Sequence, residues 1–146
     1  MATTICCDTS FLFSLYGRDA HTPRAAATVR GLKQSLALTA LNEFELLNAV
    51  RFAVFRQVLP AVAGATIIQA FETDVADGKL VIEGCNLARV LAEAKQLSMA
   101  QTMAGGHRSF DILHIAAALQ LKADTFLSFD ANQRALAQAA GLMVQT

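Results

Sequence analysis

Residues 3–16 have the sequence TTICCDTSFLFSLY, which places a strand and a helix in direct succession. Thr3 to Cys7 is a short apolar run that favours a β-strand, and Asp8-Thr9-Ser10 then supplies side chains that cap a helix at its N-terminus. The apolar residues from Phe11 to Tyr16 form that predicted helix. A strand that passes straight into a helix is the repeating unit of α/β domains, so this stretch predicts that fold class.

The rest of the chain continues the alternation. Further strands are predicted over residues 36–39, 124–129 and 142–144, and residues 79–83 are either a short strand or an irregular connection. Helices are predicted over residues 24–34, 41–57, 61–77, 86–103, 109–122 and 130–140. Thr22 is expected to cap the first of these helices, with Pro23 at its first position. We therefore expect one domain over residues 1–146, with helices on both faces of a short, mainly parallel central sheet.

The composition excludes several classes of protein. The 146 residues are 54% hydrophobic and 16% charged, so the chain is not intrinsically disordered. Twelve lysines and arginines balance twelve aspartates and glutamates, which excludes a strongly basic coat for nucleic acid but leaves room for a local groove. The longest run without a charge, residues 57–71, is too short to span a membrane and is interrupted by Pro60 and Gly64.

The N-terminus and the cysteines indicate a cytoplasmic protein. Residues 1–4 carry no positive charge ahead of an apolar stretch, so no signal peptide is expected. Cys6, Cys7 and Cys85 are odd in number and lack the spacing of a zinc site. We expect reduced thiols and no association with a membrane.

Five acidic residues are placed to meet at one edge of the predicted sheet. Asp8 follows the first strand directly, and Asp130 follows the 124–129 strand in the same way. Asp111, Glu43 and Glu45 fall in the first turns of predicted helices. In open α/β sheets ligands bind beyond the carboxyl ends of the strands, and helices that follow parallel strands begin at the same edge. The five carboxylates are therefore expected to line one cleft.

Such a cluster allows two interpretations. Carboxylates repel and raise one another's pKa, whereas a bound Mg²⁺ or Mn²⁺ ion removes the repulsion and activates water for phosphodiester hydrolysis. In the other interpretation each acid only stabilises the start of a helix: Asp8 as an N-cap, Asp130 in a capping box with Gln133, Glu45 three residues after an Asn42 cap, and Asp111 through the helix dipole. The two roles are compatible, because both need an acid at a helix start.

Four segments resemble the acidic motifs of the PIN-domain nucleases in order and spacing. They are Asp8-Thr9-Ser10 after a strand, Glu45-Leu46 within residues 39–49, Asp111 followed by His114 within residues 110–119, and Asp130 at the end of residues 126–130. Residues 135–142 are also similar to the usual ending of that family. The resemblance covers essentially the whole chain, and it is strongest to the VapC-like toxin ribonucleases of bacterial toxin–antitoxin modules.

The resemblance implies a PIN-like three-layer α/β/α fold and a ribonuclease that depends on Mg²⁺ or Mn²⁺. It assigns metal binding and catalysis to Asp8, Glu45, Asp111 and Asp130. Glu43 stays an alternative to Glu45, because the two lie about 200° apart around a helix and the helical period does not choose between them.

Six further residues are candidates for supporting roles: Thr9, Ser128, Asn132 and His114 near the acids, and Arg51 and Arg56 as RNA contacts. Asn132 stands where some members of the family carry a further acid, and an amide oxygen is a weaker metal ligand than a carboxylate. His114 lies on the same helix face as Asp111, so it touches substrate, orients Asp111, or only packs in the core.

The resemblance also implies partners, since members of the family are commonly homodimers held inactive by a small antitoxin protein. Phe52, Phe55 and Leu59 follow a helical spacing and form either core or the groove or dimer surface that such partners cover. Two other functions stay open. One is a catalytically idle PIN-like scaffold that binds RNA or a protein, and the other is an unrelated α/β domain in which Asp8 accepts a phosphoryl group.

Overall fold

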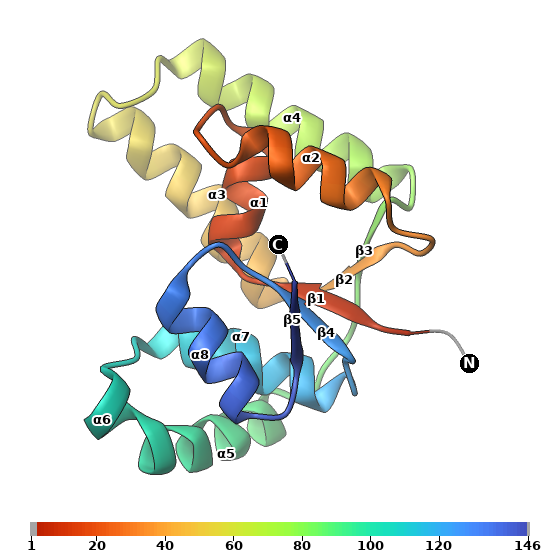
Figure 1. Ribbon diagram of the computed structural model, residues 1–146. Coiled ribbons are helices and arrows are strands. Elements are labelled where there is room, and N and C mark those ends of the chain that lie inside the picture. Colours follow the sequence, from red (N-terminus) through yellow and green to blue (C-terminus); the bar gives the residue numbers. More distant parts are fainter. Residues whose placement is uncertain (1–2, 146) are drawn as a thin grey trace.

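Five short parallel strands form the central layer of the computed structural model, which describes residues 3–145 (Figure 1). They are β1 (Ile5–Cys7), β2 (Leu36–Leu38), β3 (Leu80–Ile82), β4 (Thr125–Leu127) and β5 (Met143–Gln145). β4 pairs in parallel with both β1 and β5, and β2 pairs in parallel with β3. Hydrogen bonds thus join the strands into two sheets, β1-β4-β5 and β2-β3. β1 and β2 lie beside each other, so the layer has the order β3-β2-β1-β4-β5. The predicted parallel sheet is confirmed.

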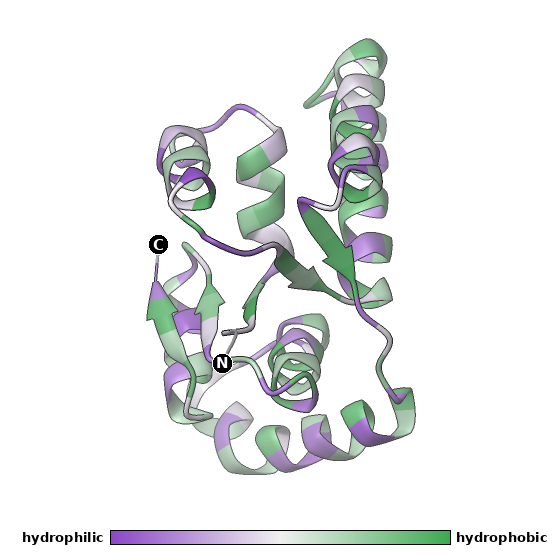
Figure 2. Cartoon of the chain, turned by 90° about the vertical axis from the view of Figure 1, so that its right-hand side faces the viewer, coloured by the Kyte–Doolittle hydropathy of each residue, from purple (hydrophilic) through white to green (hydrophobic). Residues whose placement is uncertain are grey.

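Helices cover both faces of this layer. One face carries α1 (Thr9–Tyr16), α2 (Thr22–Arg30), α3 (Ala40–Phe55) and α4 (Ala61–Ala76). The other face carries α5 (Leu87–Leu97), the π-helix η1 (Ser98–Thr102), α6 (Met103–Gly105), α7 (Ser109–Gln120) and α8 (Ala131–Ala139). Figure 2 shows the apolar strands, in green, between the two helical layers. The expected three-layer α/β/α fold is therefore confirmed.

The strands β1, β2 and β4 are buried on both faces, whereas β3 and β5 are partly exposed. Ile5 and Cys7 of β1 belong to the core beneath α1 to α4, whereas Cys6 belongs to the core against α5, α7 and α8. Leu127 and Phe126 of β4 divide between the two cores in the same way. A strand that is covered on both sides reads as a continuous apolar run, which explains the sequence pattern.

Aspartates follow two of the strands and cap the helices after them. Asp8 comes directly after β1, whereas Asp130 lies three positions after Leu127, because β4 ends earlier than the predicted 124–129 strand. Asp8 caps α1 by accepting a hydrogen bond from the backbone N–H of Phe11. Asp130 caps α8 by accepting from the N–H groups of Asn132 and Gln133. Both caps are as predicted, so each of these strand–helix junctions is fixed by its own sequence.

The predicted cap of α3 is wrong. Thr39 is the N-cap, and Asn42 lies at the third helical position, where its side chain accepts from the backbone N–H of Thr39. This reciprocal pair is a capping box with an amide in the place of Glu or Gln. The helix therefore begins at Ala40, one residue before the predicted start.

The α2 helix also differs from the prediction. It begins at Thr22 and ends at Arg30, four residues before the predicted end, with Gly31 as its C-cap. The hydroxyl of Thr22 does not cap the helix but donates to the carbonyl of Ser14 at 2.6 Å. Thr22 thus ties the start of α2 to α1.

Two other predicted boundaries are refined. Residues 86–103 form three successive helical segments, α5, η1 and α6, and the last ends before Gly106 at a φ of 67°. Residues 79–83 contain a strand, β3, rather than an irregular connection.

Several apolar side chains on α3 and α4 face solvent. Phe52 and Phe55 are 53% and 78% exposed, so the core interpretation is wrong for both, whereas Leu59 packs against the core. Within residues 3–145, none of the helices has the length and apolar character needed to cross a membrane.

Candidate active site

All four acids assigned by the motifs line one cleft of about 800 Å³ at the carboxyl ends of β1 and β4. Asp8 lies at the β1–α1 junction, Glu45 on α3, Asp111 in the first turn of α7 and Asp130 at the β4–α8 junction. The parallel pairing of β1 with β4 brings the two junctions to the same edge of the sheet. Glu43 is not among the residues that line the cleft, so of the two glutamates the geometry favours Glu45.

The carboxylate of Asp8 is buried and held by three donors. Its Oδ1 accepts from the N–H of Phe11 at 2.8 Å, and its Oδ2 accepts from the hydroxyls of Ser128 at 2.6 Å and Ser10 at 2.9 Å. Burial raises the pKa of Asp8 above its ordinary value, although these hydrogen bonds oppose the shift. A positive charge placed in the cleft would therefore stabilise the ionised form of Asp8 strongly.

Glu45 is oriented by a buried histidine. His114 Nε2 lies 2.8 Å from Glu45 Oε1, and the hydroxyl oxygen of Thr9 lies 3.1 Å from the same nitrogen. Burial alone would raise the pKa of Glu45, but the hydrogen bonds from His114 and Thr9, together with the charge of Arg108, lower it below its ordinary value. Glu45 is thus ionised at neutral pH. His114 is buried, as the core interpretation expects, and the acid that it orients is Glu45 rather than the expected Asp111.

Asn42 determines which ring nitrogen of His114 carries the proton. Its Nδ2 can only donate, and it lies 3.2 Å from the carbonyl oxygen of Cys7 and 3.4 Å from His114 Nδ1. Its Oδ1 accepts from the N–H of Thr39 at 3.1 Å, which assigns the orientation of the amide. His114 Nδ1 is therefore an acceptor, and Nε2 carries the proton that Glu45 accepts. The sequence predicts only a capping role for Asn42.

Asp111 is paired with an arginine at the rim of the cleft. Nε of Arg108 lies 3.1 Å from Asp111 Oδ2, and the arginine side chain is 81% exposed. Hydrogen bonding to Asp111 raises the pKa of Arg108, and Asp130 and Glu45 add to the effect. Among the described residues that line the cleft, Arg108 is the one lysine or arginine. It is therefore the cation that faces the acids.

Ser128 connects the two carboxylates that end the strands. Its hydroxyl donates to Asp8 Oδ2 and accepts the N–H of Asp130 at 3.0 Å. Asp130 is exposed, and both of its capping bonds, to the N–H groups of Asn132 and Gln133, use Oδ1. Capping therefore does not exclude a second role for Asp130. Asn132 reaches Asp130 through its backbone and is not among the residues that line the cleft.

Gln133 joins α8 to α7. Its buried side chain was the predicted partner of Asp130 in a capping box, but its Nε2 donates instead to the carbonyl oxygen of Asp111 at 2.9 Å. The capping box is therefore wrong, while the Asp130 cap itself is present. The bond fixes the distance between the two helices that carry Asp111 and Asp130.

The donor set has the chemistry of a Mg²⁺ or Mn²⁺ site, because carboxylate oxygens are hard ligands. Throughout residues 3–145, no three Asp, Glu, His or Cys side chains form a group that could hold one ion between them. In proteins Mg²⁺ is usually held by one or two carboxylates and keeps several waters. The arrangement therefore fits a hydrated ion rather than a closed cage of protein ligands.

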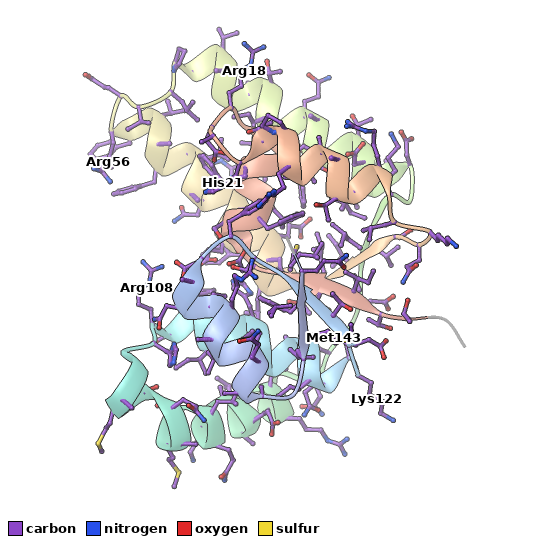
Figure 3. All side chains as sticks on the ribbon, in the orientation of Figure 1. Arg18, His21, Arg56, Arg108, Lys122 and Met143 are labelled. Atoms are coloured by element: carbon purple, nitrogen blue, oxygen red, sulfur yellow. The ribbon has the colours of Figure 1, made fainter. Side chains whose placement is uncertain are left out.

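The two arginines predicted to contact RNA do not line the cleft. Arg51 and Arg56 are exposed on or just after α3, and the guanidinium of Arg56 lies 5.8 Å from the centre of the Phe52 ring. Figure 3 shows Arg56 at the end of α3, whereas Arg108 lies beside the start of α8. Their contact with RNA stays a prediction.

The cleft also contains Asp19, His21 and Phe129, which the sequence analysis did not single out. Asp19 accepts from the backbone N–H of His21 and from the hydroxyl of Ser14. The signal for this loop is Asp19 followed by Thr22 and a proline, since short polar side chains at such positions form hydrogen-bonded turns.

Comparison with known proteins gives a family and a fold. The family described as PIN domain matches residues 5–139. Among solved structures, the crystal structure of FitAcB from Neisseria gonorrhoeae resembles this chain with a TM-score of 0.66 and 17% sequence identity, over 98% of this chain and 97% of that one. None of the curated proteins compared with the chain matches it. The family predicted from the four acidic motifs is thereby confirmed.

Proposed function

Because this chain belongs to the PIN-domain family, we propose that it is a metal-dependent endoribonuclease that hydrolyses the phosphodiester bonds of RNA. PIN domains are generally nucleases and usually bind divalent metal ions. The observation that carries the proposal for this chain is the convergence of Asp8, Glu45, Asp111 and Asp130 on one cleft. These residues come from four separate parts of the fold. The capping of individual helices therefore does not explain why all four carboxylates line the same cleft.

We propose that these four carboxylates surround a hydrated metal ion and that one or two of them contact it directly. Asp8 presents a buried carboxylate that is fixed by three donors, and Glu45 is ionised and oriented by His114. Mg²⁺ or Mn²⁺, when bound, supplies an activated water and neutralises charge on the leaving oxygen of the phosphodiester. Thr9 and Ser128 support the site by contacting His114 and Asp8 respectively.

Arg108 has a second role in this proposal. It neutralises Asp111 in the structure and lies at the exposed rim, where a phosphate of the substrate enters. An arginine matches the geometry of a phosphate with two parallel hydrogen bonds. We expect Arg108 to leave Asp111 when metal and RNA bind and to contact the phosphate instead.

We further propose that the protein acts in the cytoplasm as the toxin of a toxin–antitoxin pair. The support is the resemblance of its motifs to the VapC-like toxins and the apolar surface on α3 and α4. Phe44, Phe55 and Val62 are 61%, 78% and 80% exposed on these helices, and exposed apolar surface of this kind marks interaction sites. A small antitoxin protein and a second copy of the chain are the proposed partners.

A catalytically idle scaffold that binds RNA or a protein is the second candidate. It is favoured by two observations: in the described part of the chain the acids do not form a three-ligand group, and Arg108 is paired with Asp111. The two candidates differ in whether RNA is cut, so one experiment separates them.

The experiment is incubation of the purified protein with a structured RNA pool, in Mn²⁺ or Mg²⁺ and in EDTA. Asp111→Asn is compared with Asp77→Asn, an exposed acid at the end of α4 that is not among the residues lining the cleft. The nuclease predicts cutting that needs metal, is lost in Asp111→Asn and is kept in Asp77→Asn. Absence of cutting by a sample that mass spectrometry shows to be free of any inhibitor would support the scaffold.

A further inference from the structure

A column of three aromatic rings leads from the core to the rim of the cleft. Phe11 is fully buried and stacks on Phe129, with ring centres 5.4 Å apart and an angle of 19° between the planes. Phe129 stacks in turn on His21, with ring centres 4.4 Å apart and an angle of 7°. Phe129 and the exposed His21 both line the cleft. Since Phe129 directly precedes Asp130, the column ends in a flat ring beside the acids.

The loop that carries His21 fixes its position. Its backbone N–H donates to Asp19 Oδ1 at 2.8 Å, and Asp19 Oδ2 accepts from the hydroxyl of Ser14 at 2.8 Å. The hydroxyl of Thr22 accepts the N–H of Asp19 at 2.9 Å and donates to the carbonyl of Ser14. These bonds tie the loop to α1. The ring of His21 is therefore held in place before any ligand arrives, which lowers the entropic cost of binding to it.

The charges that line the cleft indicate that RNA is held by a contact other than ion pairs with its phosphates. Five carboxylates line the cleft, from Asp8, Asp19, Glu45, Asp111 and Asp130, against the one arginine, Arg108. Affinity for nucleic acid from phosphate contacts depends on cations, which are scarce here. Stacking of a base on an aromatic ring does not depend on charge and accepts any base.

We propose that His21 and Phe129 form a stacking shelf for one unpaired nucleobase of the RNA, beside the phosphate that is cut. The proposal rests on the proposed ribonuclease function and adds that the substrate is unpaired at this position. The base lies on His21, and Phe129 supports the ring from the other side. Figure 3 shows His21 above the β4–α8 loop and Arg108 beside the start of α8, so the base and the phosphate are met from two sides.

The test compares three variants for cleavage of a single-stranded RNA oligonucleotide. His21→Ala removes the shelf and is expected to lower kcat/KM by about 5- to 150-fold, the range for loss of one base–aromatic stack. His21→Phe keeps an aromatic face and is expected to keep kcat/KM within about 3-fold of the parent protein. Met143→Ala is the control, because Met143 is an exposed side chain on β5 that does not line the cleft. It is expected to have no effect.

Two further measurements distinguish stacking from other roles of His21. An abasic nucleotide is placed at each position of the oligonucleotide in turn, and at one position the loss is expected to match that of His21→Ala without adding to it. The salt dependence of His21→Ala is expected to equal that of the parent, whereas loss of a phosphate contact would reduce the slope by about one. The shelf is overturned if no position couples to His21, or if His21→Phe is as defective as His21→Ala.

A binding measurement tests the stacking shelf independently of the proposed nuclease activity. The same oligonucleotide carries a fluorescent adenine analogue at the coupled position, or at each position in turn if no cleavage is seen, and its quenching reports stacking. Cleavage with quenching that is unchanged in His21→Ala overturns the shelf and leaves the nuclease. Quenching that depends on His21 without cleavage supports the shelf and overturns the nuclease. Neither cleavage nor quenching overturns both.

Discussion

The β1–α1 and β4–α8 junctions have the same local arrangement, but their aspartates differ in burial and in hydrogen bonding. In both, a three-residue strand ends and an aspartate caps the following helix. Asp8 is 3% exposed and its two oxygens accept from three donors, whereas Asp130 is exposed and uses Oδ1 for its own helix. Ser128 contacts both residues. The local sequence pattern thus sets the position of each carboxylate, and the surrounding residues determine its burial and its hydrogen bonds.

The difference follows from the positions of the two strands. β1 is the middle strand of the layer, so the residue that follows it is enclosed by both helical layers. β4 lies between β1 and the edge strand β5, and Asp130 reaches the rim. We infer that the Asp8 carboxylate is fixed in position before a ligand binds, whereas the exposed Asp130 carboxylate can adjust its position. The predictions below test that division.

The largest expected effect is on catalysis. Asp8→Asn keeps a good helix cap, so the fold is retained, but it removes a buried charge that is held ready for a cation. We expect RNA cleavage to fall by about 100- to 1,000-fold. Asp130→Asn should reduce cleavage by roughly 10- to 100-fold, because an exposed carboxylate is less firmly positioned. Steady-state cleavage rates of the two variants measure the difference, and equal losses would contradict the division between the junctions.

Ser128→Ala tests the residue that joins the two junctions. It removes the 2.6 Å hydrogen bond to Asp8 and the acceptor for the N–H of Asp130. We expect cleavage to fall about 10- to 100-fold, as for other partners that orient a metal ligand. Ser35→Ala is the control, because Ser35 donates to the carbonyl of Gly78 and does not line the cleft. Full activity in Ser128→Ala would show that Asp8 needs no such positioning.

The pH dependence of stability gives a smaller and more specific effect. Burial raises the pKa of Asp8 in the folded protein above the ordinary value of 3.8, so between the two values the folded state binds more protons than the unfolded state. The contribution of Asp8 to the free energy of unfolding is therefore greatest at low pH and is lost as the pH rises through the folded pKa.

Thermal unfolding in EDTA, followed from acidic to neutral pH, measures this contribution. Asp8→Asn should gain stability relative to the parent protein as the pH rises, because the variant has no buried charge to form. Parallel curves for the two proteins, or a parent protein that gains on the variant, would contradict the role of burial at Asp8.

The smallest effect concerns the cap of α8. Asp130→Ala removes an acceptor for two backbone N–H groups and should lower the free energy of unfolding by about 1 kcal/mol. Asp130→Asn should change it much less, because Asn is an equally good N-cap. Chemical denaturation of the pair measures this, and a loss as large in Asp130→Asn would show that the charge and not the cap stabilises the helix.

Most of the fold is predictable from the sequence because its signals are local. Apolar runs followed by Asp8 or Asp130 predict both junctions, and the Gly and Pro residues predict the helix ends to within a few positions. The N-terminus of α3 is mispredicted, because Thr39 and Asn42 can each cap and only the neighbouring carbonyl of Cys7 selects between them. That contact joins residues 35 positions apart, which no local pattern contains.

The candidate site is predictable in part, for the same reason. The four acids are found by their places at strand ends and helix starts, and all of them line the cleft. His114 is found by its spacing from Asp111, but its contact is with Glu45, 69 positions away. His21 gives no signal in the sequence, because its importance comes from a ring on another strand–helix junction.

The central claim is that the four carboxylates surround the site of a hydrated metal ion, and calorimetric titration with Mn²⁺ tests it most directly. The parent protein, Asp111→Asn and Asp77→Asn are titrated under the same conditions. The account predicts that the parent and Asp77→Asn bind Mn²⁺ alike and that Asp111→Asn binds at least about 10-fold more weakly. Equal binding by all three proteins, or none by the parent, would contradict it.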